Sequence, residues 1–166
     1  MGFFRWLAGS AVGWALLLAL ALAMEAVALY YQHVLGEPPC VLCIQVRLIV
    51  LGLAVVALLE LFLKDVRGAR LAGELGVLGL SGALGWKAWE LLATERGWRL
   101  GDCSMDLGLP PWLAVDHWLP WMFRPEVPCG YTPVLPGGFT MAEVLPAIAG
   151  VLIFAAAAAF VADLAD

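Results

Sequence analysis

The sequence has few charged residues, and this scarcity excludes most classes of soluble protein. Charged side chains make up 14% of the 166 residues, and hydrophobic side chains make up 63%. In a soluble domain about a quarter of the residues are charged and about half are apolar. The mean hydropathy of +0.92 agrees with this contrast. The composition therefore predicts an integral membrane protein.

Positive charge is also scarce. Nine Lys and Arg residues stand against fourteen Asp and Glu residues, which leaves a net charge of -5. Proteins that bind nucleic acids gather Lys and Arg into a basic surface, whereas the cations of this chain are scattered along it. We therefore exclude nucleic acid as a partner.

The chain has only one long polar stretch, residues 94–140. Apolar runs make up most of the rest of the chain. A hydrocarbon core of about 30 Å needs about 20 helical residues, and each run is near or above this length. The runs cover about residues 6–29, 43–63, 71–93 and 141–162. They predict an all-α membrane protein, a bundle of four transmembrane helices that forms a single domain over residues 1–166.

The first apolar run has a second interpretation, because Ala19-Leu20-Ala21 resembles the cleavage site of a signal peptide. The run continues past this tripeptide, and it is longer than the apolar part of a signal peptide, which has about 7 to 15 residues. These two features favour an uncleaved helix.

The cations predict the orientation of the helices. Three of them lie in the short loop 64–70 and Arg5 precedes the first run, whereas loop 30–42 has none and loop 94–140 has three that are spread out. Cytoplasmic loops carry the excess of Lys and Arg. We expect both termini and loop 64–70 to be cytoplasmic, with loops 30–42 and 94–140 on the outer side.

The long loop contains an aromatic stretch, residues 109–123, with three Trp residues among aliphatic ones. This stretch is too short to span a membrane, and Pro120 interrupts it. Trp is enriched where lipid headgroups meet water. We predict a short interfacial helix here. His117 is interpreted as a polar tip at that interface, because thiol exchange needs no separate base once a thiolate is present.

The third apolar run has a glycine at every third position from Gly73 to Gly85. At about 100° per residue this row winds round the helix, so it predicts close packing against more than one neighbour. Spacing also predicts three ion pairs. These pairs are Glu60 with Lys64, Arg70 with Glu74, and Lys87 with Glu90. A place for Lys87 and Glu90 in the lining of a pocket near the thiols is an alternative that stays open. Glu25 remains open between a structural role and a place near the thiols.

All four cysteines fall in segments predicted to lie outside, and none falls in the middle of an apolar run. They are Cys40, Cys43, Cys103 and Cys129. Disulfides form and persist on the non-cytoplasmic side of a membrane. A bond between the last two would restrain the long loop by about 3 to 4 kcal/mol in the loop-entropy account. Two cysteine pairs can also hold zinc, so a metal site stays an alternative.

Cys40 and Cys43 form a Cys-x-x-Cys motif next to a predicted helix start. A helix N-terminus and a nearby cation both stabilise thiolates, and Arg47 supplies such a cation. If the helix begins at Cys43, then Cys40, Cys43 and Arg47 occupy positions i, i+3 and i+7 on one stripe. The sequence therefore predicts a reactive dithiol at the membrane surface.

Residues 40–47, Cys-Val-Leu-Cys-Ile-x-x-Arg, together with the four runs and a loop with a cysteine near each end, resemble the bacterial disulfide bond formation protein B family. The members of this family are quinone-linked membrane thiol oxidases. The resemblance implies ubiquinone or menaquinone as cofactor. It also implies a periplasmic thioredoxin-fold disulfide oxidase, of the protein A type, as partner, and a place in the bacterial inner membrane.

The resemblance also implies roles for single residues. Cys40 and Cys43 match the disulfide that quinone reoxidises, with Cys43 in contact with the quinone and Arg47 supporting it. Cys103 and Cys129 match the pair that accepts electrons from the partner, with Cys103 forming the mixed disulfide. No metal is implied.

Some positions depart from the pattern of the family. Gln45 and Val46 stand where well-known members have an aromatic and an acidic residue, and Lys87 and Glu90 lie where some members offer a histidine to the quinone. These departures concern the quinone pocket and not the sulfur chemistry. Two other functions also stay open at this stage. One is a quinone reductase that resembles vitamin K epoxide reductase, and the other is a non-enzymatic four-helix membrane protein with structural disulfides or a metal site.

Overall fold

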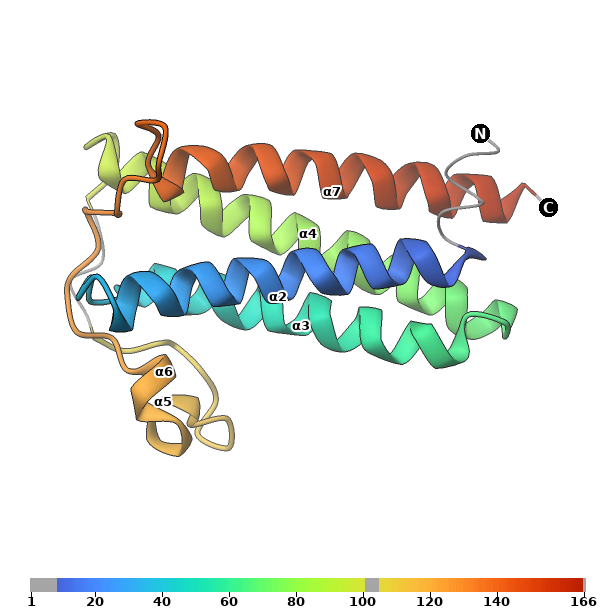
Figure 1. Ribbon diagram of the computed structural model, residues 1–166, viewed down its shortest axis with the longest axis horizontal. Coiled ribbons are helices and arrows are strands. Elements are labelled where there is room, and N and C mark those ends of the chain that lie inside the picture. Colours follow the sequence, from blue (N-terminus) through green and yellow to red (C-terminus); the bar gives the residue numbers. More distant parts are fainter. Residues whose placement is uncertain (1–8, 101–104, 166) are drawn as a thin grey trace.

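The computed structural model describes residues 9–100 and 105–165, and the regular structure within these ranges is helical. Its long helices run up and down side by side as a bundle (Figure 1). They are α2 (Ala11–His33), α3 (Val41–Leu63), α4 (Arg67–Glu95) and α7 (Met141–Leu164). Helix α2 packs on α3, α3 on α4, and α4 on α7. The predicted all-α class is confirmed.

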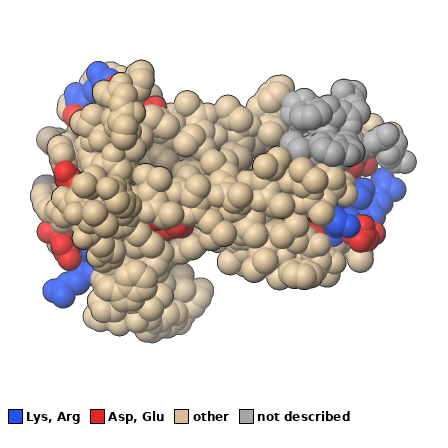
Figure 2. All heavy atoms as spheres, viewed as in Figure 1, with Lys and Arg blue, Asp and Glu red and all other residues tan. Residues whose placement is uncertain are grey.

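Three helices of the described chain, α2, α3 and α7, are long and apolar enough to cross a membrane. Helix α4, which contains the third predicted run, is not among them. Large apolar side chains are exposed between the ends of the bundle, for example Val151 (68%) and Phe154 (67%). The charged side chains on the face in Figure 2 gather toward the two ends. Exposed apolar surface of this extent is suited to lipid rather than water.

At one end of the bundle α2 and α4 end while α3 and α7 begin, and we call this the cysteine end (Figure 1, left). Gly97, with φ +71°, ends α4 there. The N–H groups of Gly97 and Trp98 donate to the carbonyls of Thr94 and Ala93 at 3.1 and 2.9 Å, a glycine-based C-cap. The chain therefore turns out of α4 sharply.

Thr140 and Glu143 form a capping box that begins α7. The hydroxyl of Thr140 also donates to Glu95 Oε2 at 3.0 Å, and the hydroxyl of Thr132 donates to the same oxygen at 2.9 Å. Thr132 is fully buried, with 2% exposed. Glu95 thus ties the end of the long loop to α4 and to α7 at once.

The glycine row of α4 contacts two neighbours, as predicted. A Cβ on Gly73 would lie 2.5 Å from the carboxyl group of Glu60 in α3, and one on Gly85 would lie 3.6 Å from Ala149 in α7. Gly79 and Gly82, by contrast, have nothing within 4 Å of that position. The row therefore serves close packing at particular points and not along its whole length.

Two of the three predicted ion pairs are wrong. Lys64 pairs with its neighbour Asp65 at 2.8 Å instead of Glu60. Arg70 pairs with Asp163 instead of Glu74, because α4 packs along α7 and brings the end of α7 to the start of α4. Spacing along one helix does not reveal such a partner on another helix.

The aromatic stretch forms two single-turn helices, α5 (Val115–Trp118) and α6 (Pro120–Phe123), in place of one short helix. Pro120 begins α6, which accounts for the interruption. The two turns lie beside the cysteine end, to one side of the bundle (Figure 1). Their apolar residues, among them Met122 and Phe123, pack against the start of α3. Three Trp residues stay exposed, namely Trp112 (72%), Trp118 (61%) and Trp121 (55%).

Candidate functional site

Helix α3 begins at Val41, two residues before the predicted start. Cys40 is therefore its N-cap, and the Cys40 sulfur accepts a hydrogen bond from the backbone N–H of Cys43 at 3.3 Å. The predicted helix start at Cys43 is therefore wrong by two residues. Cys43 and Arg47 share a face of α3 at positions i and i+4, whereas Cys40 lies above them at the helix end.

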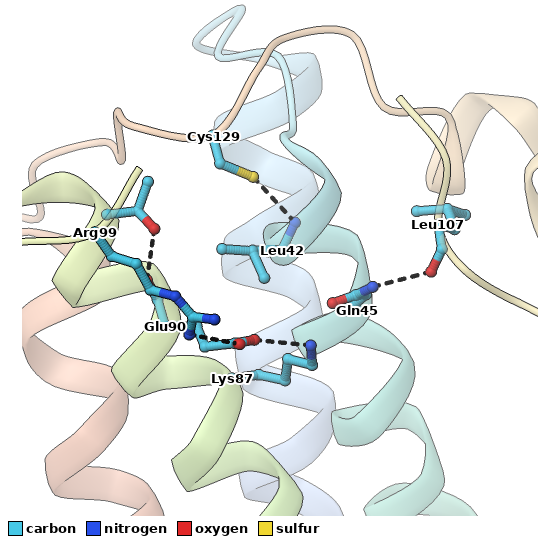
Figure 3. A network of polar contacts seen from close by, with 8 residues as sticks. Leu42, Gln45, Lys87, Glu90, Arg99, Leu107 and Cys129 are labelled. Atoms are coloured by element: carbon cyan, nitrogen blue, oxygen red, sulfur yellow. Dashed lines mark hydrogen bonds and ion pairs between the residues drawn. The ribbon is translucent and has the colours of Figure 1, made fainter. Parts of the chain in front are cut away.

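The long loop brings Cys129 to the same place. The backbone N–H of Glu126 donates to the carbonyl of Pro39 at 3.0 Å, and Val127 pairs with Cys40 in a parallel bridge. Two residues further on, the sulfur of Cys129 accepts from the backbone N–H of Leu42 at 3.5 Å (Figure 3). Cys40, Cys43 and Cys129 thus lie together at the N-terminus of α3. Cys103 lies outside the described residues.

Cys40 is the most enclosed of these three cysteines, with 1% exposed, while Cys43 and Cys129 are half-buried. The pKa of the Cys40 thiol is raised, first by its hydrogen bond to Cys129, then by its hydrogen bond to Cys43, and then by burial. A raised pKa keeps a thiol neutral and therefore slow as a nucleophile. In the reduced protein Cys40 is held as a thiol between its two neighbours.

Arg47 is buried in α3, with 5% exposed, and is held by two other segments. Its Nη1 donates to Gln32 Oε1 at 2.6 Å and to the carbonyl of Met122 at 2.9 Å. Its Nε lies 3.6 Å from Glu25 Oε2 in α2. Gln32 also donates to the carbonyl of Trp121 at 3.0 Å. The guanidinium therefore joins α2, α3 and α6.

A cavity of about 340 Å³ lies next to these groups, and Cys43, Arg47 and Glu25 all line it. Most of its other lining residues are apolar and come from α2, α3, α7 and the end of the long loop. Small-molecule sites typically combine such an apolar wall with a few polar groups. Arg47 Nη2 and Glu25 Oε2 are buried without a hydrogen-bond partner in the described part of the chain.

Lys87 and Glu90 do not line this cavity. They form the predicted pair at 2.8 Å, and Arg99 joins them at 3.0 Å from Glu90 (Figure 3). Gln45, one of the positions that depart from the family pattern, donates to the carbonyl of Leu107 at 2.9 Å. These residues connect the long loop to the helices.

Comparison with known proteins agrees with the arrangement of the cysteines. The family model described as "Disulfide bond formation protein DsbB" matches residues 10–161. The chain belongs to the DsbB family. The family resemblance expected from residues 40–47 and the loop cysteines is thereby confirmed.

Curated DsbB relatives share a third or more of their aligned residues with the chain. Disulfide bond formation protein B 2 of Pseudomonas aeruginosa is 41% identical over 114 residues, which span 66% of this chain and 66% of that protein. Disulfide bond formation protein B of Shewanella amazonensis is 37% identical over 138 residues, 82% of this chain and 81% of the relative. That of Pasteurella multocida is 34% identical over 148 residues, with shares of 86% and 81%.

The role of several residues that hold this site could not be predicted from the sequence. Gln32 is one of several polar residues after the first apolar run, and Met122 contributes only its backbone carbonyl to Arg47. Thr132 has no neighbour in the sequence that marks its hydroxyl as a contact of Glu95. The sequence did mark Glu25 as a candidate, because an ionisable residue inside an apolar run usually faces a partner or a cavity.

Proposed function

We propose that the protein is a membrane thiol–disulfide oxidoreductase that reoxidises a periplasmic thioredoxin-fold dithiol oxidase and passes the electrons to a membrane quinone. One observation carries this proposal. Cys129, at the end of the long loop, meets Cys40 at the cap of α3, and Cys43 one turn below lines a cavity with Arg47. This arrangement supports a relay in which electrons pass from the loop cysteines to Cys40 and Cys43 and then to an acceptor in the cavity.

Thiol–disulfide exchange describes how the electrons move between the pairs. A thiolate of the partner attacks the Cys103–Cys129 disulfide, and the partner leaves oxidised, so that two thiols remain on the loop. The Cys129 thiolate then attacks Cys40 of the Cys40–Cys43 disulfide and releases the Cys43 thiolate. Cys103 next attacks Cys129, which restores the loop disulfide and leaves Cys40 and Cys43 reduced. Two electrons have then reached Cys40 and Cys43.

The residues of the cavity fit a quinone. Its lining is largely apolar, as an isoprenoid quinone requires, and the unpartnered Nη2 of Arg47 is a buried donor beside Cys43. Arg47 would donate to a quinone oxygen and stabilise negative charge in a low-dielectric site. The partner is itself an oxidant, so a cysteine pair can oxidise it only if a stronger acceptor removes the electrons. When bound, the quinone supplies that acceptor for two electrons.

Membrane placement is part of the same proposal. Helix α4 would be the fourth transmembrane helix, because it lies between α3 and α7 over their length (Figure 1). Arg67 and Arg70 at its start favour a cytoplasmic position for that end, which puts both termini in the cytoplasm and the cysteine end in the periplasm. The exposed Trp residues around α5 and α6 suit the headgroup region of a bacterial inner membrane.

A coupled assay tests the proposed function. Purified protein supplied with ubiquinone or menaquinone should oxidise a reduced periplasmic thioredoxin-fold oxidase catalytically, with one quinone consumed for each disulfide formed. Cys43→Ser should abolish turnover, while Gly79→Ala, a change at an open position of α4, should leave it intact. Undiminished quinone consumption by Cys43→Ser would refute the proposal.

A further inference from the structure

Arg47 is a buried cation with two acidic neighbours. Its guanidinium interacts electrostatically with the carboxyl group of Glu25 and with the thiol of Cys43. Arg47 and Glu25 are each 5% exposed, and their side chains lie 3.6 Å apart between Nε and Oε2. Glu25 Oε2 has no hydrogen-bond partner within the described residues, and all three side chains line the cavity.

One cation cannot compensate two anions in this environment. A buried charge without a counter-charge is costly, and the attraction between a buried cation and a buried anion is strong because the local dielectric constant is low. A thiolate at Cys43 and a carboxylate at Glu25 therefore compete for Arg47. When one of them is charged, the other is favoured in its neutral, protonated form.

We propose that in the reduced protein Glu25 holds the proton that the Cys43 thiol gives up when it ionises. The S–H bond of Cys43 breaks, an O–H bond forms at Oε2 of Glu25, and no electrons change hands. Arg47 remains the counter-charge, first of the carboxylate and then of the thiolate, so that the net charge of the three groups is unchanged. The proton stays in the cavity and is not released to solvent.

This inference rests on the proposed function in one respect, since it takes Cys43 as the thiol that donates electrons toward the cavity. It adds a role for Glu25 as the proton-holding residue of that site. Reduction of a quinone consumes two protons with two electrons. A carboxylic acid beside Arg47 would keep one of these protons where it is needed.

Other ionisable groups around the three side chains are few. Cys40 and Cys129 face Cys43 from the cap of α3 and from the long loop. The hydrogen bonds of Cys40 favour an anion at Cys43, whereas a charge on Cys129 would oppose it. Tyr31, Glu37 and Tyr131 also line the cavity. The cavity-lining residues of α4 and α7 are apolar, among them Leu91, Met141 and Leu145. Among the described residues Arg47 is the one cation of the lining, so the competition between Glu25 and Cys43 dominates.

The test measures the pH dependence of Cys43 alkylation in full-length, reduced protein freed of quinone, with peptide mass spectrometry after iodoacetamide pulses. Glu25→Gln removes the competing carboxylate, so the midpoint of the rate profile should move about one to three pH units lower. Glu25→Asp should restore a profile close to that of the wild type. Glu126→Gln, which removes an exposed carboxylate of the long loop, is the matched control and should leave the profile unchanged.

The reciprocal experiment covers the case in which Glu25→Gln does not fold. Coupling between two sites is mutual, so removing Cys43 must shift Glu25 by the same amount. Infrared difference titration of Cys43→Ser against the wild type should therefore show the Glu25 carboxyl band disappearing at lower pH in the variant. Glu60 and Glu74, the other buried glutamates, are common to both proteins.

An unchanged Cys43 profile in folded Glu25→Gln, or an unchanged Glu25 band in Cys43→Ser, would overturn the inference. Neither measurement uses quinone or a partner protein. A failure of the proposed function would appear instead as absent turnover in the wild-type coupled assay, so the two failures are distinguishable.

Discussion

The guanidinium of Arg47 connects α3 to two other segments of the chain. Its hydrogen bonds reach the end of α2 through Gln32 and the loop through the carbonyl of Met122. A buried hydrogen bond to a charged group contributes about 1.5 to 3 kcal/mol. The same side chain thus positions the segment around α6 and offers a free donor to the cavity.

Replacing Arg47 should therefore have two effects. We expect Arg47→Ala to weaken quinone binding by about tenfold or more, in line with a lost charge-assisted hydrogen bond. Backbone amides of residues 119–124 should also exchange hydrogen faster. Arg47→Lys keeps the charge but not the fork of donors, so it should recover part of the affinity. Quinone titration measures the affinity, and hydrogen-exchange mass spectrometry measures the exchange rates of the amides. Wild-type affinity in Arg47→Ala would contradict a role of Arg47 in quinone binding.

The thiol of Cys40 leads to a prediction about chemical reactivity. Its pKa is raised by its neighbours Cys129 and Cys43, so the thiolate fraction at pH 8 is small. In native, reduced protein we expect Cys40 to be alkylated about tenfold or more slowly than Cys129, since each unit of pKa changes the thiolate fraction by about ten. The rate at Cys40 should still be rising with pH in the alkaline range. Equal rates at the two residues, or a plateau for Cys40 near neutral pH, would contradict the assignment.

At the scale of the elements, the apolar pattern predicts the helices well, because a helix that faces lipid must be apolar along its length. The predicted runs 43–63 and 141–162 correspond to α3 and α7, and the runs 6–29 and 71–93 overlap α2 and α4. The ends are less predictable. Cys40 moves the start of α3 to Val41 because its sulfur caps the helix, and α4 begins at Arg67, inside the predicted loop.

Contacts between elements could not be predicted from the sequence, because their partners lie far apart in the chain. The pair of Arg70 with Asp163 and the bond from Arg47 to Met122 join residues that are far apart in the chain. Spacing rules predict side-chain pairs only between residues three or four positions apart in one helix. The sequence therefore identifies Cys40, Cys43, Arg47 and the loop cysteines as site candidates, but the partners that hold the site depend on the packing.

The close approach of α4 to α3 can be tested with two glycines of one helix. Gly73→Ala would put a Cβ against the carboxyl group of Glu60, whereas Gly79→Ala meets nothing within 4 Å. We expect the first change to destabilise the protein by about 1 to 3 kcal/mol through overpacking. The second should be neutral or stabilising by about 0.5 to 1 kcal/mol. Thermal unfolding in detergent measures both, and equal melting temperatures would contradict the predicted difference.

Glu95 connects the elements on which the loop depends. It accepts hydrogen bonds from Thr132 and Thr140, and Thr132 is three residues from Cys129. We expect Glu95→Ala to loosen this part of the loop and slow electron transfer from the loop cysteines to Cys40 and Cys43. The affinity for quinone should change less, because Glu95 does not line the cavity. Rapid-mixing kinetics with reduced partner give the transfer rate, and a wild-type rate would contradict a positioning role.

At the scale of the whole molecule, the bundle separates two kinds of surface. Its flanks expose apolar side chains, while the charged groups on the face in Figure 2 lie toward the ends. The cysteine-bearing loop and the Trp-rich turns lie at one end (Figure 1). A bilayer requires this distribution of a membrane protein, and it suits the proposed exchange of electrons with a water-soluble partner. The helices hold the N-terminus of α3 and its three gathered cysteines at the cysteine end of the bundle.

Disulfide mapping of the double variant Cys43→Ser/Cys103→Ser tests the central claim, electron transfer between Cys129 and Cys40, most directly. The two remaining cysteines lie next to each other at the cap of α3, so mild oxidation should join Cys40 and Cys129 in nearly every molecule. Mass spectrometry of peptides under non-reducing conditions would identify the bond. If both cysteines remain thiols, or form disulfides only between molecules, the two cysteine pairs do not form a relay.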